Sequence, residues 1–235
     1  MELAKLSWTD ADAHDVDAVL CPVGSTEQHG PHAPLGTDTM LAEAVAHRGG
    51  ATSEHEVIIA PSVPVGIAEE HRAFAGTIWF TPDTFRQVVT EIVQSVASHG
   101  WDRVVLVNGH GGNSAALREV AARLTRDGDA RCAAFTWFDA TDISRSEMGH
   151  GGPIETSALL AAMPDLIQET QLEAAASGAA NRWGRWVGGT NLAYDSDTFS
   201  ESGVVGDPRE ASAQRGEQLL SQAAANLATV IDDLV

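Results

Sequence analysis

The sequence predicts an α/β fold in which a mainly parallel β-sheet is covered by helices on both faces. Strand-like and helical segments alternate through the first 165 residues. The strand-like segments are apolar throughout and lack the alternation of apolar and polar residues that marks a half-exposed strand. Strands buried on both faces are typical of parallel sheets. We expect residues 1–235 to form a single domain of this class.

The predicted strands are short apolar runs bounded by turn residues, a pattern that indicates buried strands. Residues 18–23, AVLCPV, end at Gly24, and residues 103–107, RVVLV, lead into the sequence NGHGGN at residues 108–113. Two further runs have the same character: residues 56–66 and 131–138.

The clearest predicted helix covers residues 81–100. Its apolar side chains recur at the spacing of one helical face, at Phe85, Val88, Val89, Ile92, Val93 and Val96. Thr81 suits its N-cap, Pro82 its first turn and Gly100 its end. We expect further helices at residues 39–48, with Asp38 or Thr39 as N-cap, at 114–128 and at 211–235. Residues 176–210 show no period and predict long loops over one end of the sheet.

The charge balance excludes some classes of partner. The net charge is −19, from 33 acidic and 14 basic residues that include the single lysine, Lys5. A protein without a basic footprint is not expected to bind nucleic acid. Dispersed acidic residues with few lysines favour adaptation to a salt-rich (halophilic) cytosol over an ordinary acidic protein.

The sequence contains neither a membrane span of about 18 apolar residues nor a signal-peptide pattern. We therefore expect a soluble cytoplasmic protein that does not contact membranes. Cys21 and Cys132 both lie in apolar runs, so they are expected to be buried free thiols rather than a disulfide.

Residues 24–38, GSTEQHGPHAPLGTD, gather two carboxylates and two imidazoles in one loop after a predicted strand. The loop at 108–113 and the segment at 149–157 follow other predicted strands. Loops after parallel strands meet at one edge of a sheet, where ligands bind. We therefore expect the following side chains to converge: Glu27, His29, Asp38, His110, His150 and Glu155.

Imidazoles mixed with carboxylates, without thiolates, suit a catalytic divalent metal such as zinc, manganese or iron. A carboxylate can bridge two ions about 3.5–4 Å apart, the arrangement that two-metal hydrolases use to activate water. Four histidines outside these loops lack such neighbours and are expected to be structural or solvated: His14, His47, His55 and His99.

At these residues the sequence resembles the creatininase family of metal-dependent amidohydrolases. The resemblance covers most of the chain, through PVGSTEQHGPHAPLGTD at 22–38, EEHRAFAGT at 69–77, VLVNGHGGN at 105–113, HGGPIETS at 150–157 and SGVVGDP at 202–208. It implies a three-layer α/β/α sandwich with a mainly parallel sheet, assembled as a homo-oligomer, often a hexamer. It also implies a divalent metal cofactor, with two ions per chain.

The resemblance assigns metal ligands to four positions. Asp38 corresponds to the carboxylate that bridges the two ions. Glu27 and His110 would complete the shell of one ion, and His29 would bind the other. In creatinine-hydrolysing members the metal loop resembles NGHYEN, and its Glu binds the second ion, but Gly112 stands at that position here.

Glu155 is the obvious substitute for this missing ligand. The alternatives are that Glu155 only hydrogen-bonds a ligand histidine, or that the enzyme holds a single ion. The resemblance also places His150 next to the scissile bond, where it could polarise the carbonyl or protonate the leaving nitrogen. A histidine that merely packs at a helix N-terminus is the alternative for His150.

The resemblance also suggests positions near the substrate. His71 matches a position beside the site that can contact substrate. Trp137 matches an aromatic residue of the substrate pocket in creatinine-hydrolysing members, and a plain core position is an equal alternative. A substrate phosphate would need cationic or backbone N–H partners, for which Arg72, Arg182 and Arg185 are candidates, with solvated surface arginines as the alternative.

The activity that we expect is hydrolysis of a C–N amide bond, other than an ordinary peptide bond, in a small-molecule substrate by metal-activated water. Deformylation of a formamidopyrimidine ribonucleotide ranks first, and trimming of a mycofactocin precursor peptide ranks second. Opening of creatinine or another cyclic amide follows. A non-catalytic binding protein ranks last, because all four matched ligands are present.

Overall fold

The computed structural model describes the backbone of residues 1–235 and all side chains except those of residues 145 and 146. Its centre is a sheet of strands β1 (Ala18–Val23), β2 (Val57–Ile59), β3 (Arg103–Asn108) and β4 (Arg131–Thr136). The strands pair in the order β2-β1-β3-β4, and every pair is parallel. The predicted parallel sheet is therefore confirmed.

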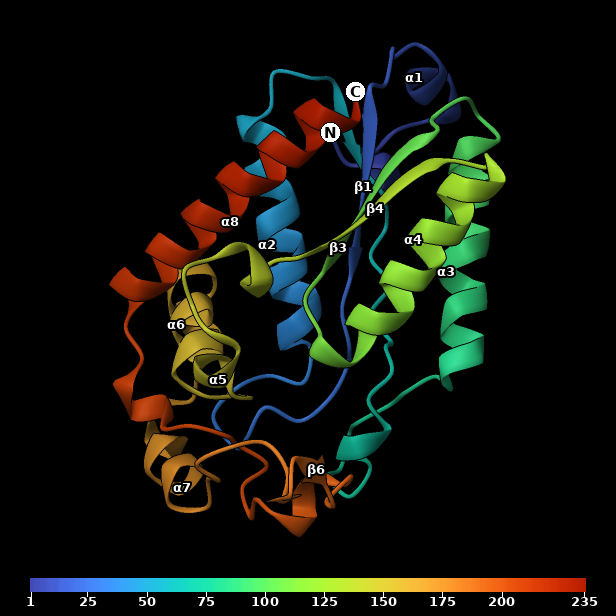
Figure 1. Cartoon of the computed structure of the whole chain (residues 1–235). Helices are drawn as coiled ribbons and strands as arrows, with labels where there is room; N and C mark the ends of the chain where they lie inside the picture. Colours follow the sequence, from blue (N-terminus) through green and yellow to red (C-terminus); the bar gives the residue numbers. More distant parts are fainter.

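Helices cover both faces of this sheet and form a three-layer sandwich, as predicted (Figure 1). One face carries α2 (Thr37–Thr52), α6 (Pro153–Ala162) and α8 (Ala213–Leu234), and the other carries α3 (Pro82–Ala97) and α4 (Ser114–Asp127). Alternate residues of β1 feed two separate apolar clusters: Leu20 packs toward α2 and α8, and Val19 and Cys21 pack toward α3 and α4. Side chains that point alternately to the two faces explain why the strands are apolar throughout.

Short elements complete the chain. They are the helices α1 (Trp8–Asp12), α5 (Arg145–Met148) and α7 (Leu172–Ser177), and the antiparallel hairpin of β5 (Trp186–Val187) and β6 (Thr190–Asn191). Within residues 176–210 the backbone is mostly irregular, as expected. Figure 1 shows this segment at the end of the sheet opposite the chain termini.

Several element boundaries differ from the prediction. Helix α2 starts at Thr37 with Gly36 as N-cap, so Asp38 lies in the first turn and neither Asp38 nor Thr39 is the cap. Strand β2 covers three residues instead of the predicted eleven-residue segment, because Pro61 and Pro64 lack the N–H group that a strand needs.

Helix α3 begins as predicted, since Thr81 Oγ1 accepts a hydrogen bond from Thr84 N. It ends at Ala97 rather than at Gly100, which adopts φ +87° in the turn beyond.

Cys21 and Cys132 are free thiols, and burial raises the pKa of each to about 12. Cys21 is fully buried and Cys132 partly so, in agreement with the expectation. Among the described residues, no helix combines the length and apolar character required to cross a bilayer.

Candidate metal centre

The predicted ligands converge at the carboxyl ends of β1 and β3. Glu27 and His29 come from the loop after β1, Asp38 from the first turn of α2, and His110 from the loop after β3. All four side chains are buried. Gly109 permits this approach, because a Cβ atom at that position would lie 2.0 Å from the Asp38 carbonyl oxygen.

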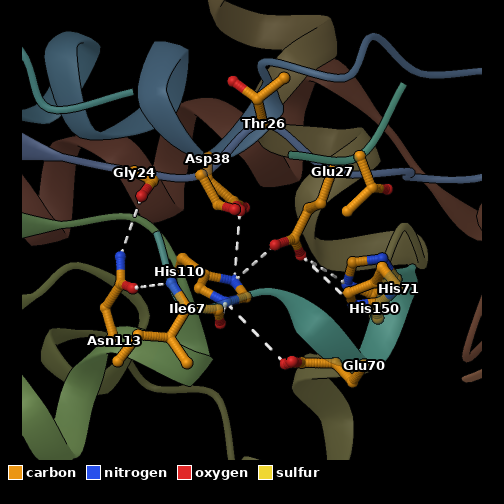
Figure 2. A network of polar contacts seen from close by, with 12 residues as sticks. Gly24, Thr26, Glu27, Asp38, Ile67, Glu70, His71, His110, Asn113 and His150 are labelled. Carbon is orange, nitrogen blue, oxygen red and sulfur yellow. Dashed lines mark hydrogen bonds and ion pairs between the residues drawn. The ribbon is translucent and has the colours of Figure 1, made fainter. Parts of the chain in front are cut away.

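Glu27, Asp38 and His110 form a first cluster whose ligand atoms could hold one ion. His110 Nδ1 lies 3.2 Å from Glu27 Oε2 and 3.3 Å from Asp38 Oδ2. Figure 2 shows the imidazole between these two carboxylates.

His29, His150 and Glu155 form a second cluster beside the first. His29 Nε2 lies 3.1 Å from Asp38 Oδ1 and 3.8 Å from Glu155 Oε1. The two oxygens of Asp38 therefore face different clusters, Oδ1 toward His29 and Oδ2 toward His110. This is the position that a bridging carboxylate needs.

The chemistry of these residues fits divalent ions. Among the described residues, Glu27 Oε1, Glu27 Oε2 and Asp38 Oδ2 are buried without a hydrogen-bond partner of good geometry. Buried anionic oxygens without partners are costly, and a bound cation removes the cost. Ligand imidazoles typically donate their other N–H to a carbonyl. Here His29 Nδ1 lies 3.2 Å from Glu27 O, and His110 Nε2 lies 2.7 Å from Ile67 O.

The electrostatics of the cluster favour positive charge. Burial opposes charge on His29, but Asp38 and Glu155 outweigh it and raise the pKa of His29 well above its usual value. Glu27 and Asp38 do the same for His110. Burial would raise the pKa of Asp38, yet His29 and His110 hold it well below its usual range. Without an ion, protons on imidazoles balance the carboxylates.

His71 and His150 behave differently. Burial, followed by charge on neighbouring histidines, lowers the pKa of both. Their rings stack with centroids 4.3 Å apart, and the Trp183 ring meets both in a T-shaped arrangement. These two imidazoles are neutral groups beside a charged cluster.

A cavity of about 410 Å³ opens beside the clusters. Its inner lining includes His110, His150 and Glu155, and its outer lining includes Phe138, Met148 and Trp183. Glu155 is buried, and its Oε2 accepts a hydrogen bond from Gly151 N at 2.6 Å. Its Oε1 faces His29.

The residues predicted to contact substrate are only partly brought together. His71 lines the cavity, but the described lining does not include Trp137, Arg182 or Arg185. Trp137 packs fully buried in the core under α6 and α8, and its lining role is therefore not realised here. Both arginines are exposed. Arg72 is also exposed and pairs with Asp195 at 2.7 Å.

Sequence reasoning missed several polar residues at the site. Gln28 is buried and contacts both His71 and His150. Glu70 lies 4.0 Å from His110 Nε2, and burial raises its pKa. Arg118, on α4, lines the cavity and lies 3.9 Å from Asp139. Gln28 and Glu70 each adjoin a predicted site residue, a signal that the sequence offered, whereas nothing around Arg118 marked it.

By the resemblance described above, Gly112 stands at the position of a ligand glutamate in creatinine-hydrolysing members. A Cβ atom at Gly112 would lie 2.4 Å from both His110 Nε2 and Ile67 O. The loop in this conformation therefore has no room for a side chain, and the second cluster takes its carboxylate from Glu155 on α6 instead.

Two proteins of named function are similar to most of this chain. The chain is 37% identical over 212 residues to the mycofactocin precursor peptide peptidase of Mycolicibacterium smegmatis, covering 88% of this chain and 81% of that protein. It is 30% identical over 191 residues to the creatinine amidohydrolase of Pseudomonas putida, covering 70% and 73% of the two chains.

Solved structures share the fold. A crystal structure of a creatinine amidohydrolase aligns with a TM-score of 0.82 and 25% identity over 99% of this chain and 96% of that one. A manganese creatininase aligns with a TM-score of 0.80 and 24% identity over 99% and 97%. The family model described as creatininase, creatinine amidohydrolase, matches residues 4–231. The chain therefore belongs to the creatininase family.

Proposed function

We propose that this creatininase-family hydrolase cleaves a peptide-like amide bond with the help of divalent ions. The observation that carries the proposal is the convergence of Glu27, Asp38 and Glu155 with imidazoles at the inner end of one cavity. The similarity to mycofactocin precursor peptide peptidases favours the activity that the sequence analysis ranks second over the deformylase that it ranks first.

Glu27, Asp38 and His110 would hold one ion, and His29, Glu155 and Asp38 would hold the other. The buried oxygens without hydrogen-bond partners support this arrangement. When bound, zinc, manganese or iron ions supply the Lewis acidity that activates water and polarises a carbonyl.

His150 is the proton carrier. It lines the cavity, and its Nδ1 lies 3.8 Å from Glu27 Oε1. Its Nε2 is held by the Gln28 carbonyl oxygen at 2.6 Å, so Nδ1 is the nitrogen that is free to accept a proton. We infer that Nδ1 takes a proton from a water in the cavity and returns it to the leaving nitrogen.

The outer cavity suits a peptide better than a nucleotide. Its lining includes the apolar side chains of Phe138, Ile143 and Met148, and the arginine in the described lining, Arg118, lies 3.9 Å from the carboxylate of Asp139. The exposed Arg182 and Arg185, proposed from the sequence as phosphate partners, lie outside the described lining. Creatinine hydrolysis ranks behind the peptidase because Gly112 replaces the family's ligand glutamate.

The first test is metal content per chain for the wild type and Glu155→Gln, measured by elemental analysis in high salt. We expect two ions in the wild type and one in the variant. Two ions in both would make Glu155 a hydrogen-bonding neighbour of a ligand, and one ion in both would contradict the two-ion arrangement.

The second test compares substrates on the metal-loaded enzyme. Short peptides should be cleaved, with released fragments identified by mass spectrometry, whereas creatinine and a formamidopyrimidine ribonucleotide should not react. Release of formate from the nucleotide without peptide cleavage would overturn the substrate assignment. No hydrolysis of any of these amides, together with loss of metal at neutral pH, would support a binding protein.

A further inference from the structure

Backbone carbonyls fix the proton positions of His29, His110 and His150. Each of these rings has one nitrogen against a carbonyl oxygen: Glu27 O at 3.2 Å, Ile67 O at 2.7 Å and Gln28 O at 2.6 Å, respectively. A carbonyl only accepts hydrogen bonds, so the ring nitrogen that contacts it carries the proton. In the neutral ring the opposite nitrogen then has a lone pair, which in all three residues faces the carboxylates.

His71 has the opposite arrangement. Its Nδ1, on the side away from Glu27, lies 2.8 Å from the side-chain nitrogen of Gln28 and 3.1 Å from Ser196 Oγ, a hydroxyl that can donate or accept. An amide nitrogen only donates, so Nδ1 accepts and the proton of the neutral ring resides on Nε2. That nitrogen lies 3.4 Å from Glu27 Oε1. His71 therefore turns an N–H group, rather than a lone pair, toward the cluster.

The orientation of the Gln28 amide is itself determined by the backbone. Its Oε1 accepts from Gly30 N at 2.8 Å, and its Nε2 donates to Gly203 O at 3.0 Å. A flipped amide would place oxygen against oxygen and nitrogen against N–H, and both bonds would be lost. Gly203, in the SGVVGDP segment, leaves the necessary room, because a Cβ atom there would lie 2.1 Å from Gln28 Oε1.

We propose that Gln28 is a positioning residue that points the Nε2–H group of His71 toward Glu27 and leaves His150 Nδ1 as the lone-pair nitrogen of the site. Its side-chain amide sets His71, and its backbone carbonyl sets His150. Gln28 Nε2 and His150 Nε2 lie 3.0 Å apart, and in this arrangement both carry hydrogen. Their contact is therefore not a hydrogen bond.

This arrangement divides the two oxygens of Glu27. Oε1 faces the His71 N–H group at 3.4 Å, and Oε2 lies with Asp38 and His110 (Figure 2). It also decides among the candidate ion positions. The group of Glu27, His71 and His150 has suitable distances, but an N–H at His71 Nε2 excludes that ring as a ligand. The inference rests on the proposed function only for its effect on catalysis.

The direct test is nitrogen NMR of ¹⁵N-histidine-labelled, metal-free full-length protein, with the His71 signals assigned by the variant His71→Gln. We expect a proton on Nε2 and a bare Nδ1 for the neutral ring of His71, and the same arrangement for His150. A proton on Nδ1 of neutral His71 would overturn the inference. The result does not depend on any hydrolysis, so it remains distinguishable from failure of the proposed function.

Gln28→Glu tests whether Gln28 sets the proton of His71, because an ionised carboxylate accepts a hydrogen bond where the amide donates one. The proton of His71 should move to Nδ1, and kcat should fall about 10- to 100-fold, the loss typical of residues that orient metal ligands. Gln214→Glu makes the same charge change at an exposed residue of α8 and should change neither quantity. An unmoved His71 proton in folded Gln28→Glu would contradict the role of Gln28.

Discussion

Burial has opposite effects on stability in the apolar layers of this protein and in the polar cluster at the end of its sheet. Leu227 of α8 is fully buried and packs against α2 at Gly49, where a Cβ atom would lie 2.6 Å from its side chain. Glu27 and Asp38 are equally buried, yet they keep oxygens without hydrogen-bond partners among the described residues. Burial stabilises the fold in the first region. In the second region burial destabilises the fold until a cation binds.

Because of this difference, effects on folding and effects on the site can be measured separately. The core should determine whether the chain folds, and the cluster should determine whether it binds ions and hydrolyses its substrate. Substitutions in the two regions should therefore affect different measurements.

The largest effect on function is expected for Asp38→Asn, because Asp38 faces both clusters. Activity should fall by more than about 100-fold, beyond the loss caused by residues that merely orient ligands. Metal content should fall while the circular dichroism spectrum stays unchanged. The exposed substitution Asp233→Asn should alter none of these properties. Full metal content in Asp38→Asn would break the separation of fold and site.

Leu227→Ala tests the other region. The free energy of unfolding should fall by about 2–5 kcal/mol, because the substitution leaves a cavity between α8 and α2. Denaturant titration measures this loss, and metal content per folded chain should stay at the wild-type value. Leu192→Ala, at a position 47% exposed, should cost no more than about 0.5 kcal/mol. A similar loss in both variants would mean that α8 does not form the core described.

Gly112→Ala tests whether the orientation of His110 controls metal affinity. The added methyl group would separate His110 Nε2 from Ile67 O, the bond that orients this ligand. Metal affinity should fall about 10- to 100-fold, as measured by competition with a chelator. Gly111→Ala is the matched control, since a Cβ atom there meets nothing closer than 4.0 Å. Equal affinities in the two variants would show that the loop adjusts freely.

The smallest expected effect concerns protons. The pKa values of His29 and His110 are raised in the ion-free protein, so both imidazoles are protonated below those values. An ion must displace these protons, and its affinity should therefore rise with pH. Calorimetry in buffers of different ionisation enthalpy should detect proton release on binding. Binding without proton release near neutral pH would mean that these rings are already neutral.

The raised pKa values also predict how the stability of the fold depends on pH. A raised folded-state pKa contributes stability that is complete below the unfolded-state value of about 6.5. The contribution is lost as pH rises through the folded-state value. In the ion-free protein, His29 and His110 should therefore weaken the fold toward alkaline pH.

The amino-acid sequence was enough to predict the parallel sheet, the helices around it and the main carboxylates and imidazoles that meet at its edge. Apolar strands and short loops leave few alternatives for where Glu27, Asp38 and His110 can meet. The sequence also gives rise to predictions that stay open: a homo-oligomer such as a hexamer, adaptation to salt, and a cytoplasmic location.

Which polar atoms of the site contact one another depends on the packing of the folded chain. Arg118 reaches the cavity because α4 turns it there, whereas Arg182 and Arg185 point to solvent. The protons of the four imidazoles depend on which carbonyl or amide lies behind each ring. Distant segments take part, since Ile67 O contacts His110 and Gly203 O holds the Gln28 amide. Periodicity and composition report burial, but hydrogen bonding depends on direction, which arises only when the loops are packed together.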